Sequence, residues 1–259
     1  MAGPAPILYL GDTALRGAAS YLAGVLHHNG LAFDYGPSDE PIGAGLLADQ
    51  RRLVILSDYP AAMLPAPEQD ELIAAIHAGC GLVMLGGWES YHGQGGDWQD
   101  TPVANALPVA ISPRDDRVNF DQAALLRPAA NHPILANLPW AERPPAVGGY
   151  NRFEAKPNGT TVLDVVRQQI QRDGDGFRVN PAMIDPMLVV GKQGKGRVAC
   201  LATDAAPHWV GPLVDWGTDN NPPSGNGRVT CHAPDANPVE VGACYAQFFI
   251  QLMKWCASL

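Results

Sequence analysis

Short runs of apolar residues, each closed by glycine or a small polar residue, recur along the first third of the chain. Ile7–Leu10, Leu53–Leu56 and Leu82–Leu85 contain no charged position, and Leu31–Tyr35 is a weaker run of similar length. Strands without alternation of apolar and polar residues are typical of parallel sheets that are covered on both faces. The four runs therefore predict four strands of such a sheet.

The segments between these runs have the periodicity of amphipathic helices. The first segment ends in a histidine pair followed by asparagine and glycine at 27–30, a typical helix stop. The second begins at Pro67 with acidic residues near its amino end and stops at Gly79. The apolar stripes are Leu15, Ala18, Ala19, Leu22, Val25 and Leu26 in the first, and Leu72, Ile73 and Ile76 in the second. A weak helical pattern also covers Ile42–Asp49. Alternating strands and helices predict an α/β fold.

The pattern loosens after Gly96 into a region rich in proline and aspartate, about residues 97–160. We expect an insertion with short strands and turns around the top of the sheet, within one domain that spans residues 1–259. Strand patterns return at Thr161–Val166, and then at Met187–Val190 and Arg197–Ala202, where the glycine-rich sequence between them predicts a β-hairpin.

The last part of the chain combines a loop with a strongly amphipathic helix. Residues Trp216–Pro238 have a loop-like composition. The closing helix has a wide apolar stripe that is able to dock on the sheet, formed by Val241, Tyr245, Phe248, Phe249, Leu252 and Cys256. Its aromatic face also offers a surface for homo-oligomer formation.

Polar and aromatic residues follow the predicted strands, and in an open α/β sheet ligands bind beyond the carboxyl ends of the strands. This placement predicts a site with catalytic candidates His208, Asp204 and Glu89. The ligand-binding candidates are Asp12, Asp58, Tyr59, Gly86, Gly87, Trp88, Ser90 and Trp209. The stretch from Gly81 to Gly96, in which a buried strand stops at two glycines, is the centre of this arrangement.

Composition and charge narrow the class of partner. There are 17 basic and 26 acidic residues, a net charge of -9, and no cluster of lysine or arginine. This balance argues against nucleic acid or an anionic membrane surface as partner. The sequence has no apolar run near the roughly 20 residues of a membrane span and no secretory signal pattern. The five cysteines are odd in number and lack metal-site spacing, so we expect reduced thiols in a cytoplasmic protein.

Five motifs occur together along most of the chain: GGWES (86–90), TPVANALPV (101–109), RDDRV (114–118), GKGRV (194–198) and DAAPHW (204–209). In combination they resemble the glutamine amidotransferase class I-like family of uncharacterised bacterial proteins, whose relatives include the ThuA-like proteins. The resemblance implies a flavodoxin-like, doubly wound, mostly parallel sheet with helices on both faces.

The sequence departs from working members of that class at the nucleophile. They carry G-x-C-x-G at the strand-to-helix turn, where the thiolate lies beside backbone N–H groups. Aligning Gly86 with the first glycine puts Trp88 at the cysteine position, and a shift by one residue puts Gly87 there. Cys80 precedes the strand, and Asp204 and His208 do not have His-x-Glu spacing. We therefore expect glutamine hydrolysis by the usual mechanism to be absent.

Other chemistry remains open at these residues. Ser90, His208 and Asp204 could form a nucleophile, base and orienting carboxylate, although Ser90 also fits a helix cap or turn. Asp204 and His208 could serve acid-base chemistry, or share a metal with His92 or Asp58, or form a structural hydrogen bond.

Three further features have a structural alternative. Trp88 and Trp209 could form an aromatic wall or fill a pocket that lost its nucleophile. The charged group 114–117 could position a substrate, bridge to another subunit, or form surface ion pairs. The GKGRV sequence lacks the P-loop pattern, and we expect no nucleotide there. Cys231 and His232 lack further metal-ligand spacing.

Two hypotheses follow. The first is a binding protein without glutaminase activity that holds a small polar ligand at the carboxyl edge of the sheet. The second is a hydrolase or isomerase of a small polar or sugar-like compound, with His208 as base and Asp204 or Glu89 as partner. Neither hypothesis requires a cofactor or a metal.

Overall fold

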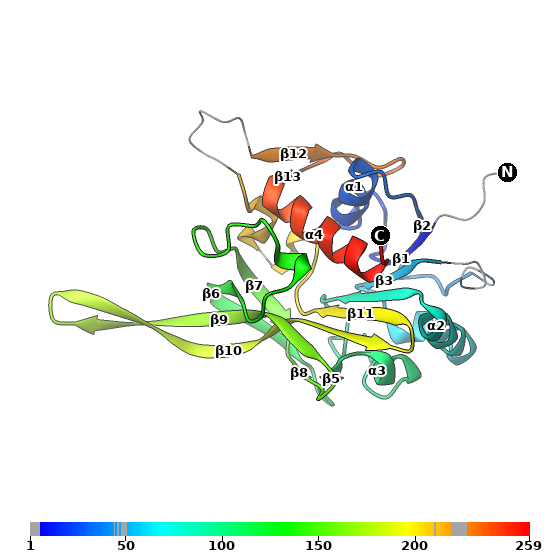
Figure 1. The fold of residues 1–259 in the computed structure, drawn as a ribbon, viewed down its shortest axis with the longest axis horizontal. Coiled ribbons are helices and arrows are strands. Elements are labelled where there is room, and N and C mark those ends of the chain that lie inside the picture. Colours follow the sequence, from blue (N-terminus) through cyan, green and yellow to red (C-terminus); the bar gives the residue numbers. More distant parts are fainter. Residues whose placement is uncertain (1–5, 44, 46, 48–50, 210, 219–226) are drawn as a thin grey trace.

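A computed structural model describes residues 6–43, 45, 47, 51–209, 211–218 and 227–259 (Figure 1). Its largest sheet has nine strands in the order β2-β1-β3-β4-β11-β10-β9-β6-β7. Their bounds are β1 Ile7–Gly11, β2 Phe33–Gly36, β3 Leu53–Ser57, β4 Gly81–Leu85, β6 Arg117–Pro128, β7 Ala146–Asn151, β9 Thr160–Asp173, β10 Gly176–Gln193 and β11 Gly196–Leu201. The helices are α1 Ser20–His28, α2 Ala66–Ala78, α3 Pro102–Ala106 and α4 Ala243–Cys256. The α/β class is thus confirmed.

The strands predicted from apolar runs form one half of this sheet. β1, β3 and β4 are buried at every position, which matches their lack of alternation. β1 pairs in parallel with β2 and β3, and β4 pairs in parallel with β3 and β11. The helix α1 contacts α4, and α2 contacts α3; Figure 1 shows the first pair above the parallel strands and the second pair beside and below them.

The helix predictions are correct in position and less so in extent. α1 begins at Ser20, whereas the apolar stripe predicted a start near Leu15; residues 15–19 form turns, and the Ser20 hydroxyl donates to the Leu15 carbonyl at 2.7 Å. α2 ends at Ala78, and Gly79 directly after it has a φ of 128°, which breaks the helix. Ile73 of its stripe is only half-buried. In the weak pattern 42–49, Ile42 and Gly43 are not helical, and residues 44, 46, 48 and 49 lie outside the described residues.

The region 97–160, where an insertion is expected, contributes two strands to the main sheet. β6 and β7 lie at its end, where β6 pairs antiparallel with both β7 and β9. The predicted hairpin is confirmed as β10 and β11, joined across Gln193 and Gly196. The sheet is therefore mixed and not mostly parallel, with four parallel and four antiparallel pairings. A small separate sheet pairs β5 (Val109–Ile111) with β8 (Phe153–Ala155).

β9 and β10 are much longer than the strands predicted at Thr161–Val166 and Met187–Val190, and they pair with each other as a hairpin that the sequence pattern did not predict. β9 pairs with β6 only as far as Val166, so residues 167–183 pair only with each other and form a two-stranded arm. Figure 1 shows this arm projecting far from the rest of the molecule. Its apolar side chains are exposed, and Phe177 is 75% accessible.

The carboxyl-terminal part closes over α1 and the parallel strands. The predicted loop Trp216–Pro238 contains a strand, β12 (Arg228–Cys231), paired with β13 (Val239–Gly242); residues 219–226 lie outside the described part. Val241 belongs to β13 and not to the last helix. The aromatic stripe of α4 is buried within the chain, with Phe248 and Phe249 fully inaccessible. No helix among the described residues is long and apolar enough to cross a membrane.

Candidate functional site

A cavity of about 260 Å³ lies at the carboxyl ends of the parallel strands. It is lined by Asp12 after β1, Asp58 after β3, Glu89 after β4 and His208 after β11. The rest of the wall is small and comes from the start of the chain: Thr13, Ala14, Gly17, Ala18 and Ser38. These four candidate side chains thus follow the ends of four adjacent strands of the sheet.

Asp12 and Asp58 adopt the same unusual backbone conformation at the first position after their strands. Their φ angles are 51° and 50°, in the left-handed region that aspartate tolerates better than most residues. The Asp12 N–H donates to the Ser57 carbonyl at 3.1 Å, and the Asp58 N–H donates to Ser90 Oγ at 3.0 Å. These bonds hold both turns in place and fix the direction of both carboxylates.

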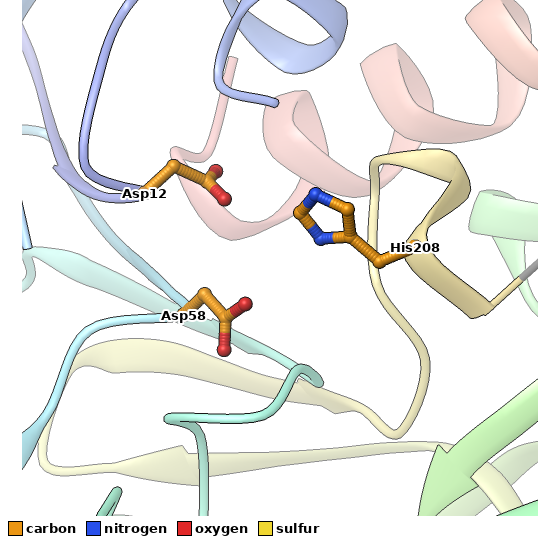
Figure 2. A group of neighbouring side chains, drawn as sticks. All are labelled: Asp12, Asp58 and His208. Atoms are coloured by element: carbon orange, nitrogen blue, oxygen red, sulfur yellow. The ribbon is translucent and has the colours of Figure 1, made fainter. Parts of the chain in front are cut away.

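Each carboxylate is held by one of its oxygens. Asp12 Oδ2 accepts from the Tyr9 hydroxyl at 3.2 Å, and Asp58 Oδ1 accepts from the Glu89 N–H at 2.6 Å. Among the described residues, no donor reaches the second oxygen of either side chain. Figure 2 shows these two carboxylates and the imidazole of His208 around a common space.

His208 is oriented by Asp204, four residues before it. Asp204 Oδ2 lies 2.6 Å from His208 Nδ1, and Oδ1 accepts from the Ala206 N–H at 2.9 Å. The Asp204 carboxylate is 1% exposed, whereas the imidazole is 44% exposed. Because a carboxylate accepts, Nδ1 must carry the proton, and Nε2 is the nitrogen left for other partners.

The three side chains form a compact group of opposite charges. One ligand atom from each of Asp12, Asp58 and His208 lies within 4.8 Å of the others. Burial, with the charges of Asp204 and Asp58, raises the pKa of Asp12 to about 8, and burial with Asp204 raises the pKa of Asp58 to about 7. The hydrogen bond to Asp204 raises the pKa of His208 to about 9. The two carboxyl groups are therefore harder to ionise than ordinary aspartates, and the imidazole is easier to protonate than an ordinary histidine.

The amino-acid sequence identifies the family of the chain. Residues 53–221 match the model of a family described as "Putative glutamine amidotransferase" (GATase1_like). The chain belongs to this family. The match confirms the family that the five motifs resemble. No curated protein matches the chain by sequence.

Several solved structures share the fold of this GATase1_like chain. "Cytoplasmic Protein STM3548 from Salmonella typhimurium" superposes with a TM-score of 0.70 at 19% identity, over 97% of this chain and 98% of that one. "Cytoplasmic Protein STM1381 from Salmonella typhimurium LT2" gives 0.64 at 24% identity, over 80% and 91%. A β-galactosidase from Rahnella sp. R3 gives 0.54 at 13% identity, over 97% of this chain and 31% of that one. At these identities the likeness concerns the fold alone.

In this GATase1_like chain, the glycine turn after β4 supports Asp58. A Cβ on Gly87 would lie 2.3 Å from Asp58 Oδ1, and one on Gly86 would lie 2.0 Å from the Ala202 carbonyl oxygen. The Gly87 N–H donates to Asn151 Oδ1 at 2.9 Å, and Asn151 Nδ2 donates to the Gly87 carbonyl at 3.1 Å. Only glycine fits at both positions, so the turn is a platform under the site.

Several predicted site residues lie outside the cavity wall. Ser90 is 2% exposed, and its hydroxyl accepts from the Asp58 N–H. Tyr59 is buried and its hydroxyl donates to the Met63 carbonyl at 2.9 Å. Trp209 is 5% exposed and packs on Gly149, whereas Trp88 is 49% exposed and lies under the Arg117 guanidinium. The two tryptophans therefore neither line nor fill the cavity.

The charged group 114–117 divides into surface and core. Arg117 pairs with Asp115 at 2.7 Å. Asp116 is 4% exposed and accepts from the N–H groups of His92 and Gly93 and from Asn151 Nδ2, at 2.8 to 3.1 Å. This group borders a larger cavity of about 640 Å³ between β5, β6 and β8, which contains no residue from the carboxyl ends of the parallel strands. His92 is not in the group with Asp12 and Asp58.

Sequence reasoning missed Asn151 and Ser38. Asn151 ends β7, in the region expected to be an insertion, so no pattern placed it beneath the turn after β4. Ser38 lies two residues after β2 and lines the cavity. Its position after a parallel strand was a usable signal.

Proposed function

We propose that this GATase1_like protein binds a small polar ligand in the cavity at the carboxyl edge of its parallel strands and does not hydrolyse glutamine through a cysteine. The observation that carries the proposal is the convergence of Asp12, Asp58 and His208 on one open cavity. We take the fold as flavodoxin-like and doubly wound. We take the protein as cytoplasmic, which the buried thiols of Cys80, Cys200, Cys231 and Cys256 support.

The loss of glutaminase chemistry is supported by the environment of the two nearest nucleophile candidates. Ser90 is buried and its hydroxyl is engaged with the backbone of Asp58. Cys80 precedes β4, at the opposite end of that strand from the cavity, and burial raises the pKa of its thiol to about 11. A thiol with this pKa supplies almost no thiolate at neutral pH.

The chemical character of the ligand follows from the wall of the cavity. Asp12, Asp58 and Glu89 line it, and Asp204 lies directly behind His208. Such a wall attracts a cation or hydrogen-bond donors, such as the hydroxyls of a sugar-like compound or an amine, and repels phosphates and carboxylates. The volume of about 260 Å³ suits a small molecule.

A specific observation also favours catalysis. The cavity is not plugged by Trp88 or Trp209, and His208 converges there with carboxylates. The second candidate function is therefore a hydrolase or isomerase in which His208 transfers a proton with Asp204 or Glu89 as partner. The raised pKa of His208 makes its imidazole a proton donor at neutral pH.

The test is a thermal-shift measurement on the wild type and His208→Ala with a panel of sugars, polyols, amines and amino acids. We expect a polyol or amine to raise the unfolding midpoint of the wild type and not that of the variant. His28→Ala is the matched control, because His28 is exposed at the end of α1, away from the cavity. An equal shift in wild type and His208→Ala, or none across the panel, would refute binding in this cavity.

A separate glutaminase assay tests the negative half of the proposal. We expect no ammonia release from glutamine by the wild type. Activity that disappears in Cys80→Ala or Ser90→Ala would contradict the proposal. Ligands that pass the thermal-shift test are then assayed for turnover, which separates binding from catalysis.

A further inference from the structure

The cavity brings together three side chains whose unengaged atoms are all metal ligands. One carboxylate oxygen of Asp12 and one of Asp58 accepts a hydrogen bond from a protein donor. The second oxygen of each has no donor among the described residues. His208 spends Nδ1 on Asp204. One ligand atom from each of the three lies within 4.8 Å of the others, so a single ion between them could contact all three.

The histidine is prepared for such a role by its partner. Metal-ligating histidines typically donate their other ring N–H to a carboxylate, which fixes the tautomer and the ring orientation. Asp204 does this at 2.6 Å and is itself held by the Ala206 N–H. The arrangement fixes the orientation of the ring and leaves Nε2 as the ring nitrogen without a hydrogen-bond partner among the described residues.

Neither carboxylate has a lysine or arginine beside it among the described residues. Asp12 is 7% exposed and Asp58 is half-buried, and the described lining of the cavity contains no lysine or arginine. Buried charges are normally paired or bound to metals. Among the described residues, the imidazole of His208 is the one basic group that faces them. A divalent cation would supply the missing positive charge.

We propose that Asp12, Asp58 and His208 hold one divalent transition-metal ion, with Asp204 as the residue that positions His208. The inference rests on the proposed function in that it names the first occupant of the same cavity. Three protein ligands leave open positions on the ion, and the remaining space has room for water or a hydroxylated ligand beside Glu89.

The donor set narrows the choice of ion. One imidazole with two carboxylates suits zinc, manganese, iron or nickel better than magnesium or calcium, which prefer oxygen ligands alone. The cysteines take no part, because Cys80 lies at the other end of β4 and Cys200 is fully buried within β11. The ion would therefore be bound without thiolate.

The experiment uses Co²⁺ as the probe on the full chain after removal of metal with a chelator. We expect one Co²⁺ per chain, visible d–d absorption without a cobalt–thiolate charge-transfer band, and displacement by Zn²⁺. Asp12→Asn, Asp58→Asn and His208→Gln should each abolish stoichiometric binding. Asp204→Asn should weaken it by about 10- to 100-fold, as loss of a positioning carboxylate does.

Matched controls keep the outcome interpretable. His28→Gln removes an exposed imidazole at the end of α1, outside the cavity, and should retain stoichiometric binding. Circular dichroism and urea midpoints show whether each variant folds, and Zn²⁺ should raise the midpoint of wild type and His28→Gln but not those of the three ligand variants. No stoichiometric Co²⁺ in wild type, binding that persists in the three ligand variants, or a thiolate band would each overturn the proposal.

A last comparison separates this inference from the proposed function. The ligand panel is repeated on metal-free and Zn²⁺-loaded wild type. One outcome is that a polyol or amine binds equally well with and without added Zn²⁺, and that no Zn²⁺ binds at Asp12, Asp58 and His208. This outcome overturns the metal site and leaves the ligand site standing. Stoichiometric metal with no panel ligand in either form refutes the polar-ligand proposal and supports the metal site.

Discussion

The two halves of the large sheet differ in how strongly their sequence determines their structure. In the parallel half, β1, β3 and β4 are buried on both faces and end within one residue of the predicted bounds. In the antiparallel half, β9 and β10 extend as an arm whose residues 167–183 pair only with each other. A strand with two covered faces must be apolar throughout, whereas a strand exposed on both faces has no such requirement.

The same difference separates the parts that build the site from the parts that support it. All four functional side chains of the cavity follow parallel strands. The antiparallel half contributes one buried side chain, Asn151, to the turn beneath them. The comparison implies that substitutions in the parallel half and at Asn151 will strongly lower the free energy of unfolding, and that changes in the arm will lower it little.

The largest contrast is expected between two glycine-to-alanine substitutions. In Gly86→Ala the new Cβ would lie 2.0 Å from the Ala202 carbonyl oxygen, so the backbone of two central strands must shift. We expect a loss of more than about 3 kcal/mol in the free energy of unfolding, at the upper end of overpacking effects. Gly174, in the turn of the arm, has φ +62° and no atom near its Cβ position, so Gly174→Ala should lose about 1 kcal/mol.

Urea unfolding of both variants measures this contrast. Similar losses in the two proteins would mean that the turn after β4 relaxes freely. In that case Gly86 and Gly87 would not act as a rigid platform beneath Asp58.

The second prediction concerns Asn151, whose side chain joins the antiparallel half to the turn after β4. Asn151→Ala removes hydrogen bonds to Gly87, Ser90 and Asp116 and leaves the buried Asp116 carboxylate short of a donor. We expect a loss of about 2 to 3 kcal/mol in the free energy of unfolding, because buried polar groups lose their partners. The control is Asn119→Ala on the exposed part of β6, which should change stability by less than about 0.5 kcal/mol.

A double-mutant cycle with Asp116→Ala shows whether the loss arises in this network. Non-additive losses are expected, because the two side chains share a hydrogen bond of 2.8 Å. Strict additivity would place the role of Asn151 elsewhere.

The sequence could predict the features that are marked by residues close together in the chain. Asp12 and Asp58 could be assigned to the site because each directly follows a fully apolar run, and parallel strands align their carboxyl ends. Asn151 could not be assigned, because its partners are the turn after β4 and Asp116, which only the paired strands bring together. Trp88 and Trp209 were assigned from their position beside strand ends, but their side chains turn to Arg117 and Gly149.

The sequence of the arm contains a turn signal, but the residues on both sides of it do not have a strand pattern. Its two-residue turn is Gly174 followed by Asp175, a dipeptide typical of hairpins. The flanking strands mix polar residues with isolated apolar ones, such as Ile170 and Phe177, so they do not show the pattern of a half-buried strand. Length and register here depend on backbone pairing, which composition does not reveal.

The third prediction tests the independence of the arm. Gln168 pairs with Pro181, so residues 169–180 can be replaced by Asn-Gly to close a short hairpin at that register. We expect a change of about 1 kcal/mol or less in the free energy of unfolding, because the removed residues have few buried contacts. The Co²⁺ affinity of the cavity should be unchanged, since no residue of the arm lines it.

Urea unfolding and Co²⁺ titration of the shortened chain test this expectation together. A loss of several kcal/mol would show that the arm stabilises the sheet despite its exposure. The expectation that changes in the arm have little effect on stability would then be wrong.

The smallest effect is expected at the ion pair within the arm. Arg178 lies 2.7 Å from Asp173, and their side chains are 64% and 58% exposed, so water screens the attraction. Arg178→Ala should therefore change the free energy of unfolding by less than about 0.5 kcal/mol, measured in urea at low and high salt. A clearly larger loss that depends on protein concentration would mean that the pair is buried against a second copy of the chain. The exposed Phe177 beside it would then belong to an interface, and the arm would be costly to change for a reason that a single chain does not contain.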